Sequence, residues 1–197
     1  MIESIFPIRY YKAQVQTTLD NNAIEQLKTL INQSVNNNLD LMHNGGISSF
    51  HVDCGLQNAE YLKPIVKELE QHAQQAWTDL NYRKDVKAVI TNMWVNGISK
   101  GGYLDEHHHL KEQLSGVYYI DLEPNTGNLV FHNPFDVNLR NSPVEPDPGN
   151  YRHIVNATTG DVVIFPGYLV HHTQRNTSDR LRLSLGFDVQ YEFTHRQ

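Results

Sequence analysis

Histidine is the residue type in this 197-residue chain that points most directly to chemistry. Of the 11 histidines, three stand together at His107-His108-His109, just before the apolar segment 114–122. In an extended backbone alternate side chains share a face, so His107 and His109 point one way and His108 points the other. Two converging imidazoles can hold a metal ion if at least one more ligand comes from elsewhere in the fold.

His171-His172 supplies candidates for that further ligand. The pair follows a predicted strand and turn at 165–170, and the stretch between the two histidine groups is long enough for barrel strands to bring them together. Metal binding is favoured because His is the commonest metal ligand. The alternative is a polar turn in which the histidines bind nothing.

A candidate anion site lies in the alternating segment 180–185. Arg180, Arg182 and Ser184 fall on one face of the predicted strand, and leucines fall on the other. An arginine on a strand that packs apolar residues is costly to bury unless it meets an anion, and its planar guanidinium suits a carboxylate. Ser184 can donate a hydrogen bond to the same anion. The alternative is a pair of exposed arginines on an edge strand.

The second half of the chain, from Val86 onward, must supply the scaffold for these residues. Hydrophobic residues there recur with period two between turn residues, which predicts strands. Regularly spaced short strands favour a closed or double-sheeted antiparallel barrel. The strands are expected at 86–95, 114–122, 128–132, 151–155, 161–165 and 180–189.

Two amphipathic helices are predicted before the β-rich half. Asp20 can cap the first, whose apolar stripe is made by Ile24, Leu27, Ile31 and Val35. The second is expected between about residues 58 and 80, with Pro64 near its first turn. An edge strand at 5–11 precedes both helices, since Pro7 excludes a central strand. We expect the helices to cover one face of the sheet.

Composition excludes several classes of protein. The net charge is −6, with 16 Lys and Arg against 22 Asp and Glu, which does not suit a nucleic-acid partner. No apolar stretch is long enough to span a membrane. The single cysteine, Cys54, excludes a disulfide framework and a cysteine-based zinc site. With no signal peptide in view, these features predict a cytoplasmic protein. A single domain over 1–197 is expected, with supporting elements in 1–85 and a β core in 86–197.

The order of these motifs resembles the iron(II)- and 2-oxoglutarate-dependent oxygenases. Within that superfamily it is most similar to a small family of oxygenases whose members open with a Phe-Pro strand. The likeness covers nearly the whole chain, and the matching motifs fall in the expected order: Phe6-Pro7, Trp94-Val95-Asn96, Leu114-Ser115-Gly116-Val117-Tyr118-Tyr119, Phe165-Pro166 and Arg182-Leu183-Ser184.

The resemblance implies a double-stranded β-helix, or jelly roll, with iron(II) at its open mouth. By position, His107 is the first metal ligand and His171 the distal one. His109 occupies the place where the superfamily has Asp or Glu, so it is the expected third ligand. This departure adds one unit of positive charge to the site relative to the usual two His and one carboxylate.

The resemblance also implies which residues hold 2-oxoglutarate. Arg182 would bind its far carboxylate, with Ser184 beside it and Arg180 as the fallback anchor. Tyr119 is the expected second contact, because strand alternation places it on one face with Ser115 and Val117.

Nearby acidic residues and a further histidine offer different ligand sets. Glu106 or Asp105 supplies the missing carboxylate if the loop bends toward the histidines. The triplet His51-Val52-Asp53 spells the superfamily's His-x-Asp motif, but no suitable strand follows it. We interpret that triplet as coincidental.

The predicted function is that of a dioxygenase that uses iron(II), 2-oxoglutarate and O2. It is expected to hydroxylate a C–H bond of an amino-acid or peptidyl substrate, prolyl residues included, with release of succinate and CO2. The alternatives are a three-His cupin-type metalloenzyme (a thiol dioxygenase or zinc hydrolase) and a non-catalytic jelly-roll binding module. The polar segment 132–150 and the strand around Trp94 and Asn96 are expected to line the substrate entrance. A homodimer is plausible.

Overall fold

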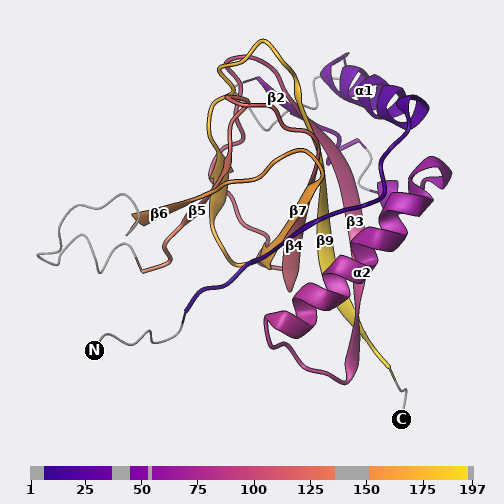
Figure 1. The fold of residues 1–197 in the computed structure, drawn as a ribbon, viewed down its shortest axis with the longest axis vertical. Coiled ribbons are helices and arrows are strands. Elements are labelled where there is room, and N and C mark those ends of the chain that lie inside the picture. Colours follow the sequence, from indigo (N-terminus) through magenta and orange to yellow (C-terminus); the bar gives the residue numbers. More distant parts are fainter. Residues whose placement is uncertain (1–6, 37–44, 53–54, 136–150, 195–197) are drawn as a thin grey trace, which may run out of the picture.

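Two antiparallel sheets form the centre of the computed structural model, which describes residues 7–36, 45–52, 55–135 and 151–194 (Figure 1). Within these residues the larger sheet has the strand order β1-β7-β4-β9-β3-β2, and the smaller has the order β6-β5-β8. The strands are β1 (Tyr11–Gln14), β2 (Gly46–Ser48), β3 (Val86–Ile98), β4 (Leu114–Asp121), β5 (Leu129–His132), β6 (Arg152–Val155), β7 (Asp161–Pro166), β8 (His171–Thr173) and β9 (Arg182–Phe193).

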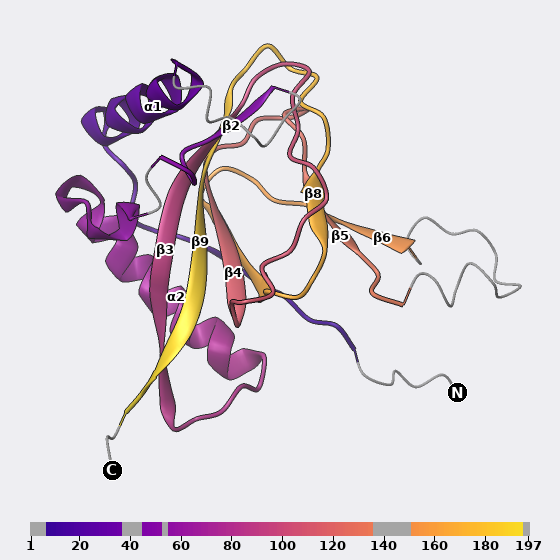
Figure 2. The same ribbon diagram turned by 180° about the vertical axis from the view of Figure 1, so that it is seen from behind.

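Two helices cover the outer face of the larger sheet, and the smaller sheet lies on its other side (Figures 1 and 2). They are α1 (Asn21–Asn36) and α2 (Lys63–Asp79), with two short 3₁₀ turns, Leu56–Asn58 and Glu60–Leu62, before α2. This confirms the predicted mainly β architecture with two flanking helices.

The ends of both helices follow from their sequences. The Asp20 carboxylate accepts a hydrogen bond from the Ala23 N–H at 2.7 Å, which satisfies one of the free amides at the start of α1. Pro64 lies in the first turn of α2, where its missing N–H costs nothing. Both helices then bury an apolar stripe that includes Leu27 and Leu69. The predicted cap and proline position are therefore confirmed.

Strand β9 separates two buried layers. Leu183, Leu185, Phe187 and Val189 face the helices and belong to the core beneath them. The intervening residues, among them Arg182, face the space between the two sheets. A second apolar cluster, which includes Phe131 and Phe165, packs between the sheets. Because residues 182–189 of β9 are buried on both faces, the polar side chains of that stretch are held inside the barrel.

The structure differs from the sequence prediction at several strands. The first strand begins at Tyr11 and pairs with β7, whereas residues 7–10 form no strand and residues 1–6 lie outside the described parts. The short strands β2 and β8 were not predicted, because three residues show no periodicity. Segment 180–189 was expected to be one strand, but β9 starts at Arg182.

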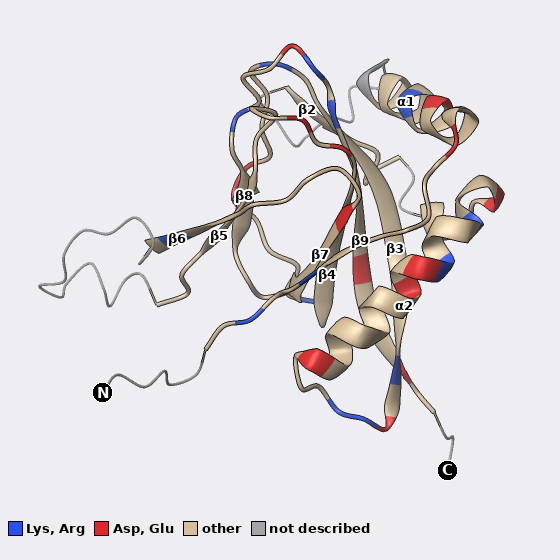
Figure 3. Cartoon of the chain, viewed as in Figure 1, with Lys and Arg blue, Asp and Glu red and all other residues tan. Residues whose placement is uncertain are grey.

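Several sequence predictions fall on residues that the structure does not describe. They are Cys54, Asp53 and most of the segment 132–150. No helix in the described parts of the chain is long and apolar enough to span a bilayer. In Figure 3, basic residues lie scattered among acidic ones on α2 and the loops. The expected absence of a nucleic-acid partner stays a prediction.

We expect Gly116→Ala to destabilise the fold. A Cβ at this position of β4 would lie 2.2 Å from Cζ of Phe187, whose ring is fully buried under the helices. Forcing extra volume into such a core costs about 1–3 kcal/mol. Chemical denaturation would measure this loss. The double variant Gly116→Ala/Phe187→Leu should lose less than the sum of its single variants, since the smaller side chain makes room. Strict additivity would contradict the steric cause.

Candidate metal centre and cosubstrate pocket

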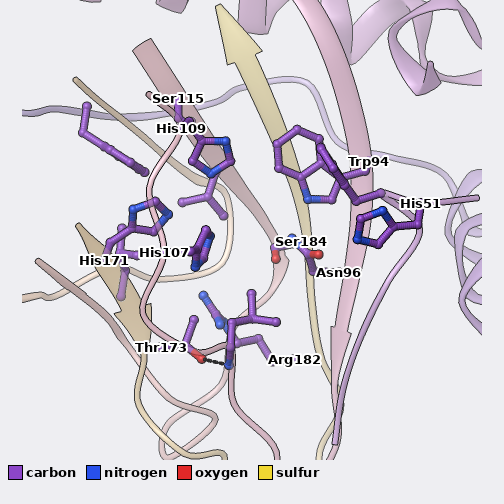
Figure 4. A pocket seen from close by; sticks show the side chains of 17 residues that line it. His51, Trp94, Asn96, His107, His109, Ser115, His171, Thr173, Arg182 and Ser184 are labelled. Carbon is purple, nitrogen blue, oxygen red and sulfur yellow. Dashed lines mark hydrogen bonds between the residues drawn. The ribbon is translucent and has the colours of Figure 1, made fainter. Parts of the chain in front are cut away.

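A cavity of about 290 Å³ lies between the two sheets and is lined by residues from both (Figure 4). Its volume is at the low end of the range for small-molecule sites, about 300–1,000 Å³. The described lining residues include Arg182 and no carboxylate. The cavity therefore suits a small anionic ligand.

Three histidines converge on one side of this cavity. His107 and His171 are joined by two backbone hydrogen bonds of 2.9 Å, and their ring centroids lie 4.2 Å apart. His109 reaches the same place, with its ring 5.4 Å from each of the others. One ring nitrogen from each residue lies within 4.8 Å of the other two. The structure thus brings together the three residues that the sequence singled out as metal ligands.

Hydrogen bonds orient two of these rings. The Nδ1 atom of His107 lies 2.7 Å from the Asp105 carbonyl oxygen, and that of His171 lies 2.9 Å from the Leu169 carbonyl oxygen. A carbonyl only accepts, so each Nδ1 carries the proton and each Nε2 has a free lone pair. Burial lowers the pKa of His107 and lowers the pKa of His171 well below its usual value. Both rings are therefore neutral at pH 7, as metal ligation requires.

The third ring, that of His109, faces a buried carboxylate instead of a carbonyl. Its Nδ1 lies 3.0 Å from Oδ1 of Asp188, whose side chain is 3% exposed. Among the described residues no hydrogen bond from another group reaches that oxygen. Asp188 was not predicted as a site residue. Strand alternation could have found it, because it shares the inner face of β9 with Arg182 and Ser184.

Arg182 lines the same cavity as the three histidines and enters it at its lower end in Figure 4, below His107. It is 2% exposed, and its Nε and Nη1 atoms have no hydrogen-bond partner among the described residues. Its guanidinium lies 5.3 Å from the ring centre of Tyr119. A buried, unpaired guanidinium is costly, so this end of the cavity is built for an anion.

Tyr119, the predicted second contact, is a neutral hydrogen-bond donor buried beside Arg182, but it is not among the described residues that line the cavity. The residue is fully buried, and its hydroxyl also has no partner among the described residues. Burial raises the pKa of Tyr119 despite the opposing influence of Arg182. The hydroxyl therefore stays protonated and can donate a hydrogen bond to a carboxylate. Tyr118, the neighbour on the opposite face, packs in the core beneath the helices.

Ser184 and Asn96 lie beside Arg182 in the cavity (Figure 4). They face each other across β9 and β3, and the Asn96 Oδ1 atom has no described hydrogen-bond partner. Arg180 was expected on this face but lies in the turn before β9. Its side chain is 63% exposed and pairs with Asp121 at 3.3 Å. Of the two candidate anchors, only Arg182 lines the cavity.

The side chains of Glu106, Asp105 and His51 lie apart from the three converging histidines. Glu106 points to the outer side of the smaller sheet, where its Oε1 lies 3.3 Å from His132 Nε2. Asp105 is exposed and contributes its backbone carbonyl to His107. His51 lines the cavity on the side away from the three histidines (Figure 4).

An aromatic wall completes the cavity on the side of β3. Trp94 is 6% exposed and stacks on His109, with an angle of 17° between the two rings. Phe50 meets the Trp94 ring edge-on and is partly exposed at the rim. Gly186 makes room for this arrangement, since a Cβ there would lie 2.5 Å from the indole. Trp94 therefore belongs to the cavity wall, and sequence reasoning missed Phe50.

The donor set fits an iron(II) ion and a dicarboxylic keto acid. Three imidazole nitrogens leave further coordination positions open on an octahedral metal. The buried Arg182 nitrogens that lack partners among the described residues match the hydrogen-bonding needs of a carboxylate in the cavity, and the Tyr119 hydroxyl lies just behind them.

Comparison with known proteins supports this interpretation. The family model described as "Putative 2OG-Fe(II) oxygenase" matches residues 92–188, which include His107, His109, His171 and Arg182. No curated protein is similar enough in sequence to count as a relative.

Solved structures share the fold at low sequence identity. An oxidoreductase of the 2OG-Fe(II) oxygenase family from Burkholderia pseudomallei is 15% identical, with a TM-score of 0.50; the match covers 68% of this chain and 57% of that one. A Pseudomonas putida prolyl-4-hydroxylase is 14% identical, with a TM-score of 0.54 and coverage of 93% and 94%. The epimerase SnoN, in complex with Fe3+, alpha ketoglutarate and nogalamycin RO, is 13% identical, with a TM-score of 0.59 and coverage of 93% and 79%.

These likenesses confirm the predicted jelly-roll fold. Proteins of the matched family are oxygenases that use iron(II), 2-oxoglutarate and O2. The match over residues 92–188 and the shared fold make this chain similar to the 2OG-Fe(II) oxygenases in the sequence of its second half and in its architecture.

Proposed function

We propose that the protein is a hydroxylase that acts on a C–H bond of an amino-acid or peptidyl substrate, with prolyl residues as the first class to test. The observation that carries the proposal is one cavity lined both by three converging imidazoles and by a buried guanidinium whose Nε and Nη1 have no hydrogen-bond partner among the described residues. His107, His109 and His171 would hold iron(II), and Arg182 would hold the far carboxylate of 2-oxoglutarate. Structural likeness to a prolyl hydroxylase supports the substrate class.

The chain's own residues bind, orient and exclude water in this proposal. Bound iron supplies the activation of O2 that the amino acids cannot provide. Arg182 and Tyr119 would fix one end of the keto acid, with Ser184 beside them, so that its other end faces the histidines. Trp94 and Phe165 close the cavity from the sides and keep it apolar near the metal ligands. The substrate would then enter at the rim, where Phe50 and His51 lie.

We assign Asp188 as a positioning residue for His109. A carboxylate at Nδ1 selects the tautomer in which Nε2 is free, and it strengthens the imidazole as a ligand. It also returns to the site the negative charge that is missing when His replaces the usual Asp or Glu ligand. In this proposal the carboxylate contacts a metal ligand, His109, and does not contact the metal itself.

Asp188→Asn should weaken binding of iron(II) to the apo protein by about 10–100-fold, the usual effect of removing such a partner. Anaerobic titration with a competing chelator would measure it, and thermal unfolding in chelator would establish that the variant folds. Asp179→Asn is the matched control, because Asp179 is exposed and pairs with Lys100 on the surface. Equal iron affinity of Asp188→Asn and Asp179→Asn would refute the role of Asp188.

The third imidazole also favours a second candidate, a three-His thiol dioxygenase that needs no keto acid. In that case Arg182 and Tyr119 would bind the carboxylate of a thiol-containing amino acid. Oxygen consumption with cysteine in the absence of 2-oxoglutarate would identify this activity.

The decisive experiment supplies the purified protein with iron(II), 2-oxoglutarate and O2, together with free amino acids or proline-rich peptides. We expect succinate release that rises with the right substrate, and a product that has gained one oxygen atom by mass spectrometry. Succinate without that mass gain would point to epimerisation or ring closure instead of hydroxylation. No succinate under any condition would reject 2-oxoglutarate as the cosubstrate.

A further inference from the structure

A second group of ligand atoms lies on the outer side of the smaller sheet. It consists of Glu106, His132 and His172, and one ligand atom from each lies within 4.8 Å of the other two. We call it the outer cluster. His132 ends β5, His172 is the middle residue of β8, and Glu106 immediately precedes His107. From these positions we propose that the outer cluster is a second metal site, which takes a zinc-like divalent cation.

Strand alternation separates the outer cluster from the cavity. His171 and Phe131 point inward, so their neighbours His172 and His132 point to the opposite face of the sheet. Both histidines are only partly exposed, and the pairing of β5 with β8, in which His172 lies opposite Val130, makes them diagonal neighbours on one face of the sheet. Two of the three ligands are therefore fixed by the sheet before any ion binds.

The distances within the outer cluster suit a tetrahedral ion. His132 Nε2 lies 2.7 Å from His172 Nδ1 and 3.3 Å from Glu106 Oε1. Zinc–ligand bonds of about 2.0–2.1 Å require ligand atoms about 3.3 Å apart. The carboxylate is already at this separation from His132 Nε2 and within 4.8 Å of the His172 ligand atom, and the two imidazole nitrogens need to move apart by about 0.6 Å. Two His and one Glu, with water in the fourth position, form a known zinc ligand set.

Hydrogen bonds among the three side chains satisfy their polar atoms less completely than a bound cation would. The Nε2 atom of His132 faces both His172 and Glu106, yet a proton on that atom can be directed toward only one of them. A cation bound among the three atoms contacts all of them at once. Among the described residues, Arg152 is a competing partner, because its Nη2 lies 3.5 Å from Glu106 Oε1. That side chain is 57% exposed, so it can turn into solvent when an ion binds.

Zinc chloride titrated into the metal-free full-length protein, followed by calorimetry, tests the proposal. We expect two ions per chain in the wild type, one in His132→Ala and one in His107→Ala. His153→Ala is the matched control on the same sheet and should keep both ions. Since His132 is partly buried, Glu106→Gln provides a variant at an exposed position, and it should bind the outer ion at least about 10-fold more weakly.

The outcomes separate this inference from the proposed function. One ion in the wild type, with no loss in His132→Ala or Glu106→Gln, would show that the outer cluster is only a hydrogen-bonded group with Arg152. Two ions in His107→Ala would leave the outer cluster intact but contradict the metal centre in the cavity. Cobalt(II) offers a second readout, because a tetrahedral ion in the outer cluster adds a strong visible absorption that Glu106→Gln should lose.

Discussion

Arg182→Met is expected to abolish productive binding of 2-oxoglutarate while leaving the protein folded. The guanidinium is the charged group that lines the described cavity, and truncating one partner of a buried charge pair costs about 2–5 kcal/mol. The dissociation constant for 2-oxoglutarate should therefore rise by about 30- to 4,000-fold. Anaerobic titration of the iron-loaded protein would measure this through the visible absorption of the keto-acid complex.

The same substitution should spare the stability of the ligand-free protein. Two nitrogens of Arg182 are buried without described partners, so replacing the side chain with an apolar one of similar length removes an unfavourable burial. We expect the free energy of unfolding to stay constant or increase. Lower affinity with unchanged stability is typical of a ligand-binding residue, whereas a structural residue would lose both.

Arg180→Met is the matched control for this experiment. Arg180 lies two positions away, is largely exposed and pairs with Asp121 on the surface. Exposed ion pairs contribute little, so this variant should bind 2-oxoglutarate like the wild type. If Arg180→Met lost the keto acid and Arg182→Met retained it, the assignment of the anchor would be reversed.

His107→Ala is expected to remove iron binding at the cavity. His107 is held against His171 by backbone hydrogen bonds, and its Nδ1 is engaged by a carbonyl, so its Nε2 is available to a metal. Loss of a group that hydrogen-bonds to a metal ligand costs about 10–100-fold in metal affinity, and loss of the ligand itself should cost more than about 100-fold. Titration in the His132→Ala background would restrict the measurement to the cavity.

His108→Ala is the control for the histidine run. His108 lies between the two candidate ligands but is exposed, as strand alternation predicts. Its replacement should leave iron affinity unchanged. Equal losses in His107→Ala and His108→Ala would mean that the run binds metal as a flexible surface group, without the cavity.

Much of the scaffold could be predicted because period-two and period-3.6 patterns are local. The inner and outer faces of β9 follow from alternation alone, which places leucines under the helices and Arg182 in the cavity. The short strands were not predicted, because local sequence patterns do not reveal long-range pairing. The three residues of β8 form a strand because they pair with β5, and that pairing is long-range.

The residues of the candidate site likewise fall into two groups, those that local sequence patterns predict and those that only the fold brings together. Residue type and spacing alone predicted that His107 and His109 share a face, that Arg182 and Ser184 share a face, and that the chain is a mainly β protein with two covering helices. Only the tertiary structure decided that Asp188 lies against His109, that Glu106 turns outward to His132, and that Arg180 leaves the cavity for the surface. The physical reason is that alternation sets which side of a strand a residue faces. Which residues meet across strands depends on register, on where each strand begins, and on how the loops between them bend.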